Sequence, residues 1–146
     1  MKIMLTGGGS LGPVTPLLGL VEHWRSQGHA LDLVWVGTKK GPEAEVVAGY
    51  DIAFHAVPSV KVPRYLTWYW LAFPLKLLIA FASAWRLLSR ERPGVIVTAG
   101  GFVSVPLVVL GRLRGIRSWV HQQDVVPGLA NKIMGWFATQ VSVTFE

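Results

Sequence analysis

Short apolar runs alternate with longer amphipathic segments along almost the whole chain. Runs such as residues 31–36 consist mainly of Val, Leu and Trp, which is typical of buried strands. The predicted strands comprise residues 3–6, 31–36, 52–57, 95–98, 118–122 and 141–145. Between them apolar residues recur at helical spacing, and the predicted helices comprise residues 14–26, 42–48, 68–90, 103–113 and 129–138. Apolar strands that alternate with helices predict an α/β fold, a parallel sheet with helices on both faces.

Glycine-rich turns follow two of the predicted strands. Residues 7–12 read Gly-Gly-Gly-Ser-Leu-Gly after the first strand, and residues 99–102 read Ala-Gly-Gly-Phe after the fourth. In a parallel sheet both turns, and residues 121–124 after the fifth strand, lie at the carboxyl edge, where ligands bind if the strand order reverses. Glycine lets the backbone approach a ligand closely, and a helix N-terminus favours an anion. The turns therefore predict a site for phosphate, pyrophosphate or a sugar hydroxyl; the alternative is that they only close βα units.

Residues 65–85 form a hydrophobic stretch that approaches the ~20 apolar residues needed to cross a bilayer. Pro74 and Lys76 interrupt it, its aromatic residues gather at one end, and a strand of the same sheet follows at once. We therefore expect a helix that lies in the membrane interface, with a membrane-associating segment at about residues 60–85. An ordinary core helix is the alternative, and we expect residues 75–88 to be partly that. The expected membrane contacts are Trp68, Tyr69, Trp70 and Phe73, with Lys61, Arg64 and Lys76 near anionic head groups.

Composition favours a membrane or a phosphate-bearing partner. Of the 146 residues, 51% are hydrophobic and 15% are charged, against a usual charged share of roughly 25%, and the net charge is +6. A basic, apolar chain suits an anionic lipid surface or a phosphate-bearing substrate. We expect no nucleic-acid partner, because the basic residues are scattered instead of gathered in one arm. Cysteine is absent and acidic residues form no cluster, so we expect neither thiol chemistry nor a metal site.

The length suits a single domain, residues 1–146, with its own core. The first residues lead directly into a strand pattern and have no cleavable signal, which favours the cytoplasmic side of a membrane. The chain stops within the predicted sixth strand, where a closing helix is usual. We therefore expect either a truncated chain or a missing second domain.

Four segments resemble the motifs of one glycosyltransferase family, in the same order along the chain. Residues 8–16 (Gly-Gly-Ser-Leu-Gly-Pro-Val-Thr-Pro) resemble its loop G-G-T-G-G-H-V-x-P. Residues 37–38 with 43–47 resemble G-T…E-x-x-L-V, and residues 100–106 resemble G-G-Y-V-S-x-P. Residues 121–132 resemble H-E-Q-N-x-x-P-G-L-x-N-[KR]. By these motifs the chain is similar to the MurG family, the UDP-N-acetylglucosamine:lipid I N-acetylglucosaminyltransferases of peptidoglycan synthesis.

The resemblance implies the N-terminal, acceptor-side half of a GT-B glycosyltransferase, an enzyme of two Rossmann-like domains. It implies inverting transfer of GlcNAc from UDP-GlcNAc to a lipid-linked diphosphate acceptor, undecaprenyl-pyrophosphoryl-MurNAc-pentapeptide. The resemblance also implies that this transfer takes place at the cytoplasmic face of the bacterial inner membrane, with peripheral membrane binding. It implies no cofactor, and it implies a C-terminal donor domain or partner subunit that holds the nucleotide. The substrate-binding residues in the matched motifs are Gly8, Gly9, Ser10, Leu11, Gly12, Gly100, Gly101, Ser104, Gln123 and Asp124.

The chain departs from the family motifs at the expected site. The family's first-loop histidine, a proposed general base, falls on Pro13, which cannot take a proton. The motif H-E-Q-N becomes H-Q-Q-D at residues 121–124, so one acid is lost and another is gained. Asp124 and His121 are therefore the ionisable candidates for a catalytic base at this edge. The alternatives are that His121 is hydrogen-bonded scaffolding and that Asp124 is a turn residue before Pro127.

Three functions remain open from the sequence. The first is the acceptor half of a MurG-like GlcNAc transferase. The second is a membrane-anchoring, acceptor-binding subunit that works with a separately encoded donor half. The third is a divergent paralogue without this activity, because of Pro13 and Asp124. A further α/β domain with its own glycine loop after Glu146 would favour the first function over the second.

Overall fold

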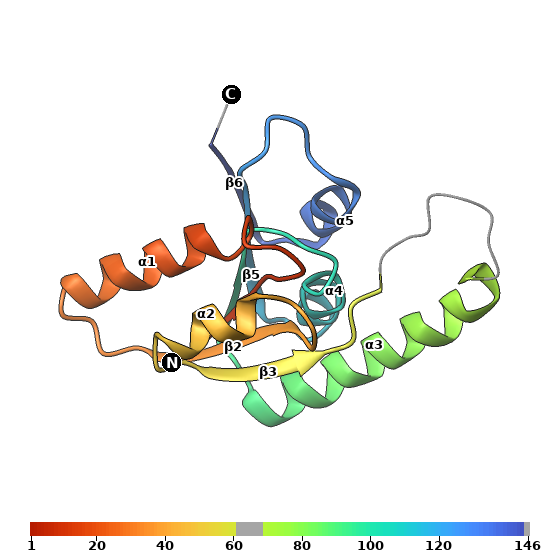
Figure 1. Ribbon diagram of the computed structural model, residues 1–146, viewed down its shortest axis with the longest axis horizontal. Helices are drawn as coiled ribbons and strands as arrows, with labels where there is room; N and C mark the ends of the chain where they lie inside the picture. The colour runs from red at the N-terminus through yellow and green to blue at the C-terminus, as the bar shows by residue number, and fades with distance from the viewer. Residues whose placement is uncertain (61–68, 145–146) are drawn as a thin grey trace.

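The computed structural model describes residues 1–60 and 69–144, which form a six-stranded sheet with helices on both faces (Figure 1). The strands are β1 (Lys2–Thr6), β2 (Asp32–Thr38), β3 (Ala53–Val57), β4 (Val95–Thr98), β5 (Arg117–Gln122) and β6 (Gln140–Val143). The helices are α1 (Thr15–Ser26), α2 (Glu43–Ala48), α3 (Tyr69–Glu91), α4 (Val105–Leu113) and α5 (Leu129–Phe137). Each predicted strand and helix is therefore present, with its ends close to those expected.

Within the described residues the strands are all parallel and follow the order β3-β2-β1-β4-β5-β6. Ile3 of β1 pairs with Leu33 of β2 on one side and with Val95 of β4 on the other. The strand order therefore reverses between β1 and β4. The carboxyl ends of these two strands frame the crevice in which open α/β sheets bind their ligands.

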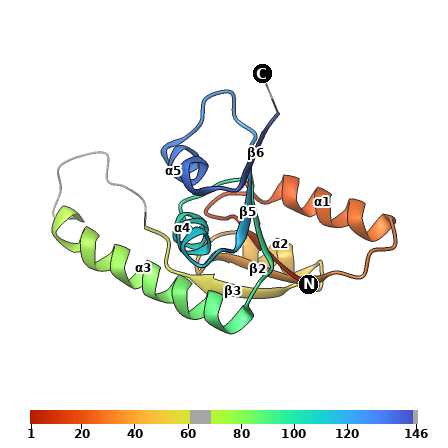
Figure 2. The same ribbon diagram turned by 180° about the vertical axis from the view of Figure 1, so that it is seen from behind.

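The two faces of the sheet are both buried. Leu5, Trp35 and Val97 point to the face covered by α1 and α2. Met4 and Ile96 point to the opposite face, covered by α3, α4 and α5. Figures 1 and 2 show this three-layer arrangement from opposite sides. The strands read as continuous apolar runs because a strand buried on both faces has no side turned to water.

α3 packs on the sheet along one side only. Its buried residues are Ala80, Ala84, Leu87 and Leu88, which agrees with the core role expected for part of residues 75–88. Its other side carries residues that are 48–67% exposed, namely Leu75, Leu78, Ile79 and Trp85. Within the described ranges, Ala72–Glu91 is one segment long and apolar enough to cross a membrane, with a mean hydropathy of 1.3.

The residues expected to touch a membrane are described only in part. Three of them lie outside the described residues: Lys61, Arg64 and Trp68. For Tyr69 and Trp70, which begin α3, the backbone alone is described. Further along the helix, Phe73 is half-buried and Lys76 is exposed. The membrane contact of this segment therefore stays a prediction.

Candidate functional site

A cavity of about 750 Å³ lies at the carboxyl edge of the sheet, between the loops that follow β1, β4 and β5. Ser10, Gly12 and Pro13 form the wall before α1, and residues 99–102 form the wall before α4. The third wall consists of residues 123–124 and the start of α5. The three loops that the sequence directs to one edge therefore meet around a single space at the point where the strand order reverses.

Hydrogen bonds to β2 hold the start of the loop after β1. The backbone N–H of Gly7 donates a hydrogen bond to the carbonyl oxygen of Val36 over 3.3 Å. The indole N–H of Trp35, which is fully buried, donates to the carbonyl oxygen of Gly7 over 3.2 Å. Because both partners belong to a central strand, the first glycine of the loop has a fixed position.

Glu43 of α2 is a fully buried carboxylate beneath the same loop. Its Oε1 accepts hydrogen bonds from the backbone N–H of Thr38 at 2.5 Å and from the Thr38 hydroxyl at 2.6 Å. The backbone N–H of Gly9 lies 3.3 Å from each carboxylate oxygen. The carboxylate fits because no side chain occupies three neighbouring positions, where a Cβ would come within 2.8 Å of a Glu43 atom: Gly8, Gly37 and Gly41.

The loop after β4 contains two adjacent glycines in a left-handed conformation. Gly100 has φ +122° and Gly101 has φ +97°, values that residues with a side chain rarely adopt. A Cβ on Gly101 would lie 2.9 Å from the carbonyl oxygen of Gly8, and one on Gly100 would lie 2.8 Å from Oδ1 of Asn131. The two glycine loops therefore pack backbone against backbone, and the second loop also packs against α5.

Three buried hydroxyl groups support the second glycine loop from below. The backbone N–H of Gly100 donates to Oγ1 of Thr98 over 3.0 Å, and that hydroxyl donates to Oγ of Ser104 over 3.0 Å. Ser104 in turn donates to the carbonyl oxygen of Gly100 over 3.2 Å. Oγ1 of Thr6 lies 3.1 Å from Oγ of Ser104 and links the cluster to β1. The ends of β1 and β4 are thus held together directly under the cavity.

Side-chain amides order the loop after β5. Nε2 of Gln122 donates to the carbonyl oxygen of Asp124 over 2.7 Å, and Nδ2 of Asn131 donates to Oε1 of Gln122. Gln123 approaches the first glycine loop, because a Cβ on Gly12 would lie 3.4 Å from its Nε2. Asp124 is exposed and lines the cavity. This loop therefore offers amide groups and one carboxylate to a bound molecule.

His121 faces β6. Its Nδ1 lies 2.9 Å from Oγ of Ser142, and its Nε2 lies 3.1 Å from Oγ1 of Thr144. Oγ of Ser142 also accepts a hydrogen bond from Nε1 of Trp119 over 2.8 Å. In the described part of the chain, His121 is not among the residues that line the cavity. These contacts fit the interpretation of His121 as hydrogen-bonded scaffolding.

Residues 3–143 match the glycosyltransferase family 28 N-terminal domain. The chain belongs to this family. It is 38% identical over 145 residues to a UDP-N-acetylglucosamine--N-acetylmuramyl-(pentapeptide) pyrophosphoryl-undecaprenol N-acetylglucosamine transferase of Geobacillus thermodenitrificans, covering 99% of this chain and 40% of the relative. The sequence resemblance to MurG is therefore confirmed, and the chain spans about 40% of the length of such relatives.

One solved structure gives the same family placement, and a second shares the fold. Acinetobacter baumannii MurG aligns with a TM-score of 0.80 at 27% identity, covering 99% of this chain and 42% of that protein. The UDP-GlcNAc 2-epimerase of Methanocaldococcus jannaschii aligns with a TM-score of 0.60 at 8% identity, covering 96% and 38%, which shows a shared fold alone. The expected fold class, the Rossmann-like N-terminal half of a GT-B glycosyltransferase, is thus confirmed.

In this family 28 domain the expected binding residues fall into two groups. Six of them line the cavity: Ser10, Gly12, Gly100, Gly101, Gln123 and Asp124. The other four lie around it. Gly8 is covered by Gly101, the N–H of Gly9 is bonded to Glu43, Ser104 is fully buried, and Leu11 is 43% exposed.

Seven residues that line the cavity were not expected from the sequence as binding residues: Pro13, Ala99, Phe102, Gly128, Leu129, Ala130 and Asn131. Glu43, which fixes the first loop, was not expected as a supporting residue. All of these except Ala99 lie inside the matched motifs, which was the available signal. Motif letters cannot distinguish a side chain that faces a ligand from one that holds a loop.

The cavity is suited to an anion that binds backbone N–H groups. α4 and α5 both begin at its wall, and neither N-cap residue, Ser104 or Gly128, caps its helix with a side chain. The first residues of α5, Leu129 to Asn131, line the cavity, so the positive end of the dipole of this helix lies at the cavity. α4 offers fewer free N–H groups, because its N-cap Ser104 is fully buried and a proline stands in its first turn. Among the described lining residues there is no Lys or Arg. The described residues also contain no group of three or more His, Asp or Glu that could hold a metal.

Proposed function

We propose that this chain is the acceptor-binding half of a MurG-like transferase, which moves GlcNAc from UDP-GlcNAc to a lipid-linked diphosphate acceptor. The observation that carries this proposal is the pair of left-handed glycines, Gly100 and Gly101, at the cavity wall before α4. A backbone without side chains lets phosphate oxygens approach the N–H groups of a loop and a helix N-terminus. The names of the relatives, which act on a pyrophosphoryl-undecaprenol compound, support the diphosphate as the anion.

Asp124 is proposed as the group that accepts the proton of the acceptor hydroxyl. It lies on the cavity wall formed by residues 123–124 and the start of α5, which also contains Asn131. Pro13, on the wall of the first loop, cannot take a proton, so this proposal takes the base from another wall of the cavity. His121 is the less suitable candidate, because both of its ring nitrogens lie beside hydroxyl groups of residues 142 and 144.

The donor half of the active site is proposed to come from a C-terminal domain or a partner subunit. Glycosyl transfer requires the anomeric carbon, its UDP leaving group and the acceptor hydroxyl to be aligned, and this alignment supplies much of the rate. The sheet of the described residues provides one ligand crevice, and the proposal assigns that crevice to the acceptor. We therefore expect the chain alone to bind the diphosphate and to show no turnover.

Peripheral binding at the cytoplasmic face of the bacterial inner membrane completes the proposal. The exposed apolar side of α3 and the net charge of +6 support contact with an anionic lipid surface. The acceptor of such an enzyme is itself a membrane lipid. A domain that rests on the membrane would meet this lipid without extracting it.

Gly128 offers a direct test of the cavity. Its φ is −65°, and a Cβ on it would meet nothing within 4 Å, so a side chain fits without strain. Asp and Asn are comparably good N-caps for α5, but only Gly128→Asp places a negative charge in the cavity. We expect isothermal titration to show that inorganic pyrophosphate binds to the wild type and to Gly128→Asn. Gly128→Asp should weaken this binding about tenfold or more.

Transfer itself is tested with radiolabelled UDP-GlcNAc and a short-chain lipid-linked muramyl pentapeptide. The chain with its donor half should transfer the sugar, and Gly128→Asp should lower kcat/KM more than Gly128→Asn does. The chain alone should give no product. Turnover by the chain alone would show that the division into acceptor and donor halves is wrong. Equal pyrophosphate affinity in the two variants would show that the diphosphate does not bind in this cavity.

A further inference from the structure

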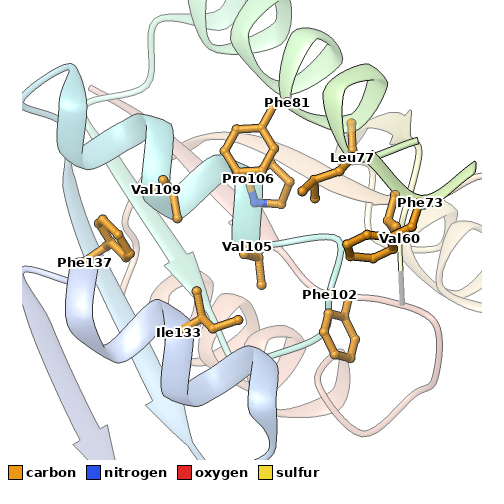
Figure 3. A pocket seen from close by; sticks show the side chains of 11 residues that line it. Val60, Phe73, Leu77, Phe81, Phe102, Val105, Pro106, Val109, Ile133 and Phe137 are labelled. Atoms are coloured by element: carbon orange, nitrogen blue, oxygen red, sulfur yellow. The ribbon is translucent and has the colours of Figure 1, made fainter. Parts of the chain in front are cut away.

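An apolar groove lies between α3, α4 and α5, beside the polar cavity (Figure 3). Its volume is about 320 Å³, which lies within the range of about 300–1,000 Å³ typical of small-molecule sites. The side chains that line it are aliphatic or aromatic, among them Leu77 and Phe81 of α3, Val105 and Val109 of α4, and Ile133 of α5. The groove therefore suits an uncharged, flexible hydrocarbon.

The groove is formed by side chains that point toward one another from three helices. Figure 3 shows Leu77 and Phe81 on one side, Val105 and Val109 on α4 below them, and Ile133 on α5 opposite. Leu77 is 36% exposed, and the other side chains named here are only partly buried. When a hydrocarbon covers apolar surface that was in contact with water in a concave site, the free energy of the complex falls, which favours binding.

Phe102 connects the groove to the polar cavity. It is the residue after Gly101 in the loop between β4 and α4, and it lines both spaces. A molecule whose anionic group lies at Gly100 and Gly101 would therefore reach the groove past Phe102, which borders both spaces. This neighbourhood is what distinguishes the groove from the exposed apolar side of α3, where Leu78 lies.

We propose that the groove binds the first part of the prenyl chain of a lipid-linked diphosphate, while the diphosphate lies on the glycine loops. The identity of the hydrocarbon as a prenyl chain rests on the proposed function. The assignment of the hydrocarbon to this groove rests on Phe102, which borders both the groove and the polar cavity, and on the apolar walls of the groove. The groove thus recognises the lipid portion of the acceptor outside the bilayer, in addition to any contact of α3 with the membrane.

A matched pair of substitutions on α3 tests the proposal in the absence of membranes. Leu77 lines the groove, whereas its neighbour Leu78 is 67% exposed and does not. Gln is close to Leu in helix propensity and carries no charge, so neither variant repels a diphosphate. Isothermal titration should give tighter binding of geranylgeranyl diphosphate, below its micelle concentration, than of inorganic pyrophosphate. Leu77→Gln should weaken binding of the prenyl compound about tenfold, and Leu78→Gln should not.

Pyrophosphate and geranylgeraniol separate this proposal from the proposed function. If pyrophosphate binds but the prenyl chain adds no affinity, the groove proposal fails and the diphosphate cavity stands. If geranylgeraniol binds and Leu77→Gln weakens it, while pyrophosphate does not bind, the groove proposal stands and the diphosphate cavity fails. Equal losses in Leu77→Gln and Leu78→Gln would overturn the groove. Val109→Trp, which fills the groove from α4, should reproduce the effect of Leu77→Gln.

Discussion

The carboxylate of Glu43 accepts a hydrogen bond from the backbone N–H of Gly9, 34 residues earlier in the chain. This contact joins the first glycine loop to α2, and through Thr38 it joins the loop to the end of β2. The N–H of Gly9 is therefore engaged inside the protein. The shape of the loop that we propose to bind an anion therefore depends on a buried acid in the layer beneath it.

Glu43→Ala should destabilise the chain by about 3 kcal/mol, because it removes a fully buried side chain and leaves the N–H groups of Gly9 and Thr38 without their acceptor. Glu43→Gln should cost less, since its amide keeps one oxygen. Urea denaturation measures the free energy of unfolding of both variants, and an unchanged m value shows that the shift in midpoint reflects stability. Glu45→Ala, two residues along the same helix and exposed, is the control and should change stability by less than about 0.5 kcal/mol. A Glu43→Ala variant as stable as this control would contradict the anchoring role.

Gly101→Ala should cost about 2 kcal/mol of folding free energy. Part of the cost is the positive φ of 97°, and part is the approach of the new Cβ to the carbonyl oxygen of Gly8 at 2.9 Å. Gly115→Ala is the matched control, with φ +71° and nothing within 4 Å of the Cβ, and should cost about 1 kcal/mol. Thermal unfolding compares the loss of stability in the two variants, each measured against the wild type. Equal losses would show that the glycine loops do not press against each other.

Stability should depend on pH through Glu91. Its carboxylate accepts a hydrogen bond from Nζ of Lys2 at 2.9 Å and lies near Arg90 and His55. The Lys2 contact first, and then these neighbours, lower the pKa of Glu91 below its ordinary value of 4.5. The same contact raises the pKa of Lys2 above 10.5. The interaction therefore stabilises the fold between these values; it is lost as pH falls through the lowered pKa of Glu91 or rises through the raised pKa of Lys2.

Urea unfolding between pH 3 and pH 7 checks this expectation. The free energy of unfolding of the wild type should fall as the pH drops below about 4.5, and Glu91→Gln should reduce that fall. Glu45→Gln, which removes an exposed carboxylate of α2, should leave the pH profile of the wild type unchanged. Identical profiles for the wild type and Glu91→Gln would exclude Glu91 as the source of acid sensitivity.

Asp124→Asn restores the residue of the family motif and removes the proposed base. In the transferase assembled from this chain and its donor half, kcat should fall by roughly 10²–10⁴-fold with little change in acceptor affinity. His121→Gln should lower kcat far less, because the ring of His121 faces Ser142 and Thr144. An Asn variant as fast as the wild type would leave Asp124 as a sugar contact or a turn residue.

Membrane binding should depend on the exposed side of α3. The double variant Leu75→Gln, Leu78→Gln should lower the fraction of the chain that floats with anionic vesicles, because both side chains are more than 60% exposed. Leu113→Gln, at a 72% exposed position at the end of α4, is the control. Binding should strengthen with anionic lipid and weaken with salt. Binding that resists high salt and carbonate would indicate a spanning helix instead.

The sequence was sufficient to predict the fold because its two periodicities are unambiguous. Buried strands such as β2 are continuous apolar runs, and α1 places Leu17 and Val21 on one side. The largest difference at a functional element is the start of α4, expected at residue 103 and found at Val105. Val103 and Ser104 belong to the turn, because Ser104 donates its hydroxyl to the loop that precedes it.

The site was predictable as a place and less so as a set of contacts. Glycine turns after β1 and β4 identify the edge, since parallel strands bring these ends together. Whether Glu43 points inward depends on the space left by Gly37 and Gly41, which a single sequence does not reveal. The direction of His121 follows from strand alternation only when the helix covering each face is known. Phe102 lines two spaces, a fact that exists only in three dimensions.

The pairing of β1 with β4 determines when the binding cavity forms as the protein is made. Thr6 meets its hydroxyl partner Ser104 across 98 residues of chain, and Gly100 meets Asn131 later still. Contacts between such distant residues form slowly, because a long loop must close before any interaction rewards it. The first glycine loop therefore meets its near partners, Val36 and Glu43, before it can meet the second glycine loop at Gly101. The cavity proposed to bind an anion takes its walls from all three loops, so it is complete only once α5 lies beside the second glycine loop.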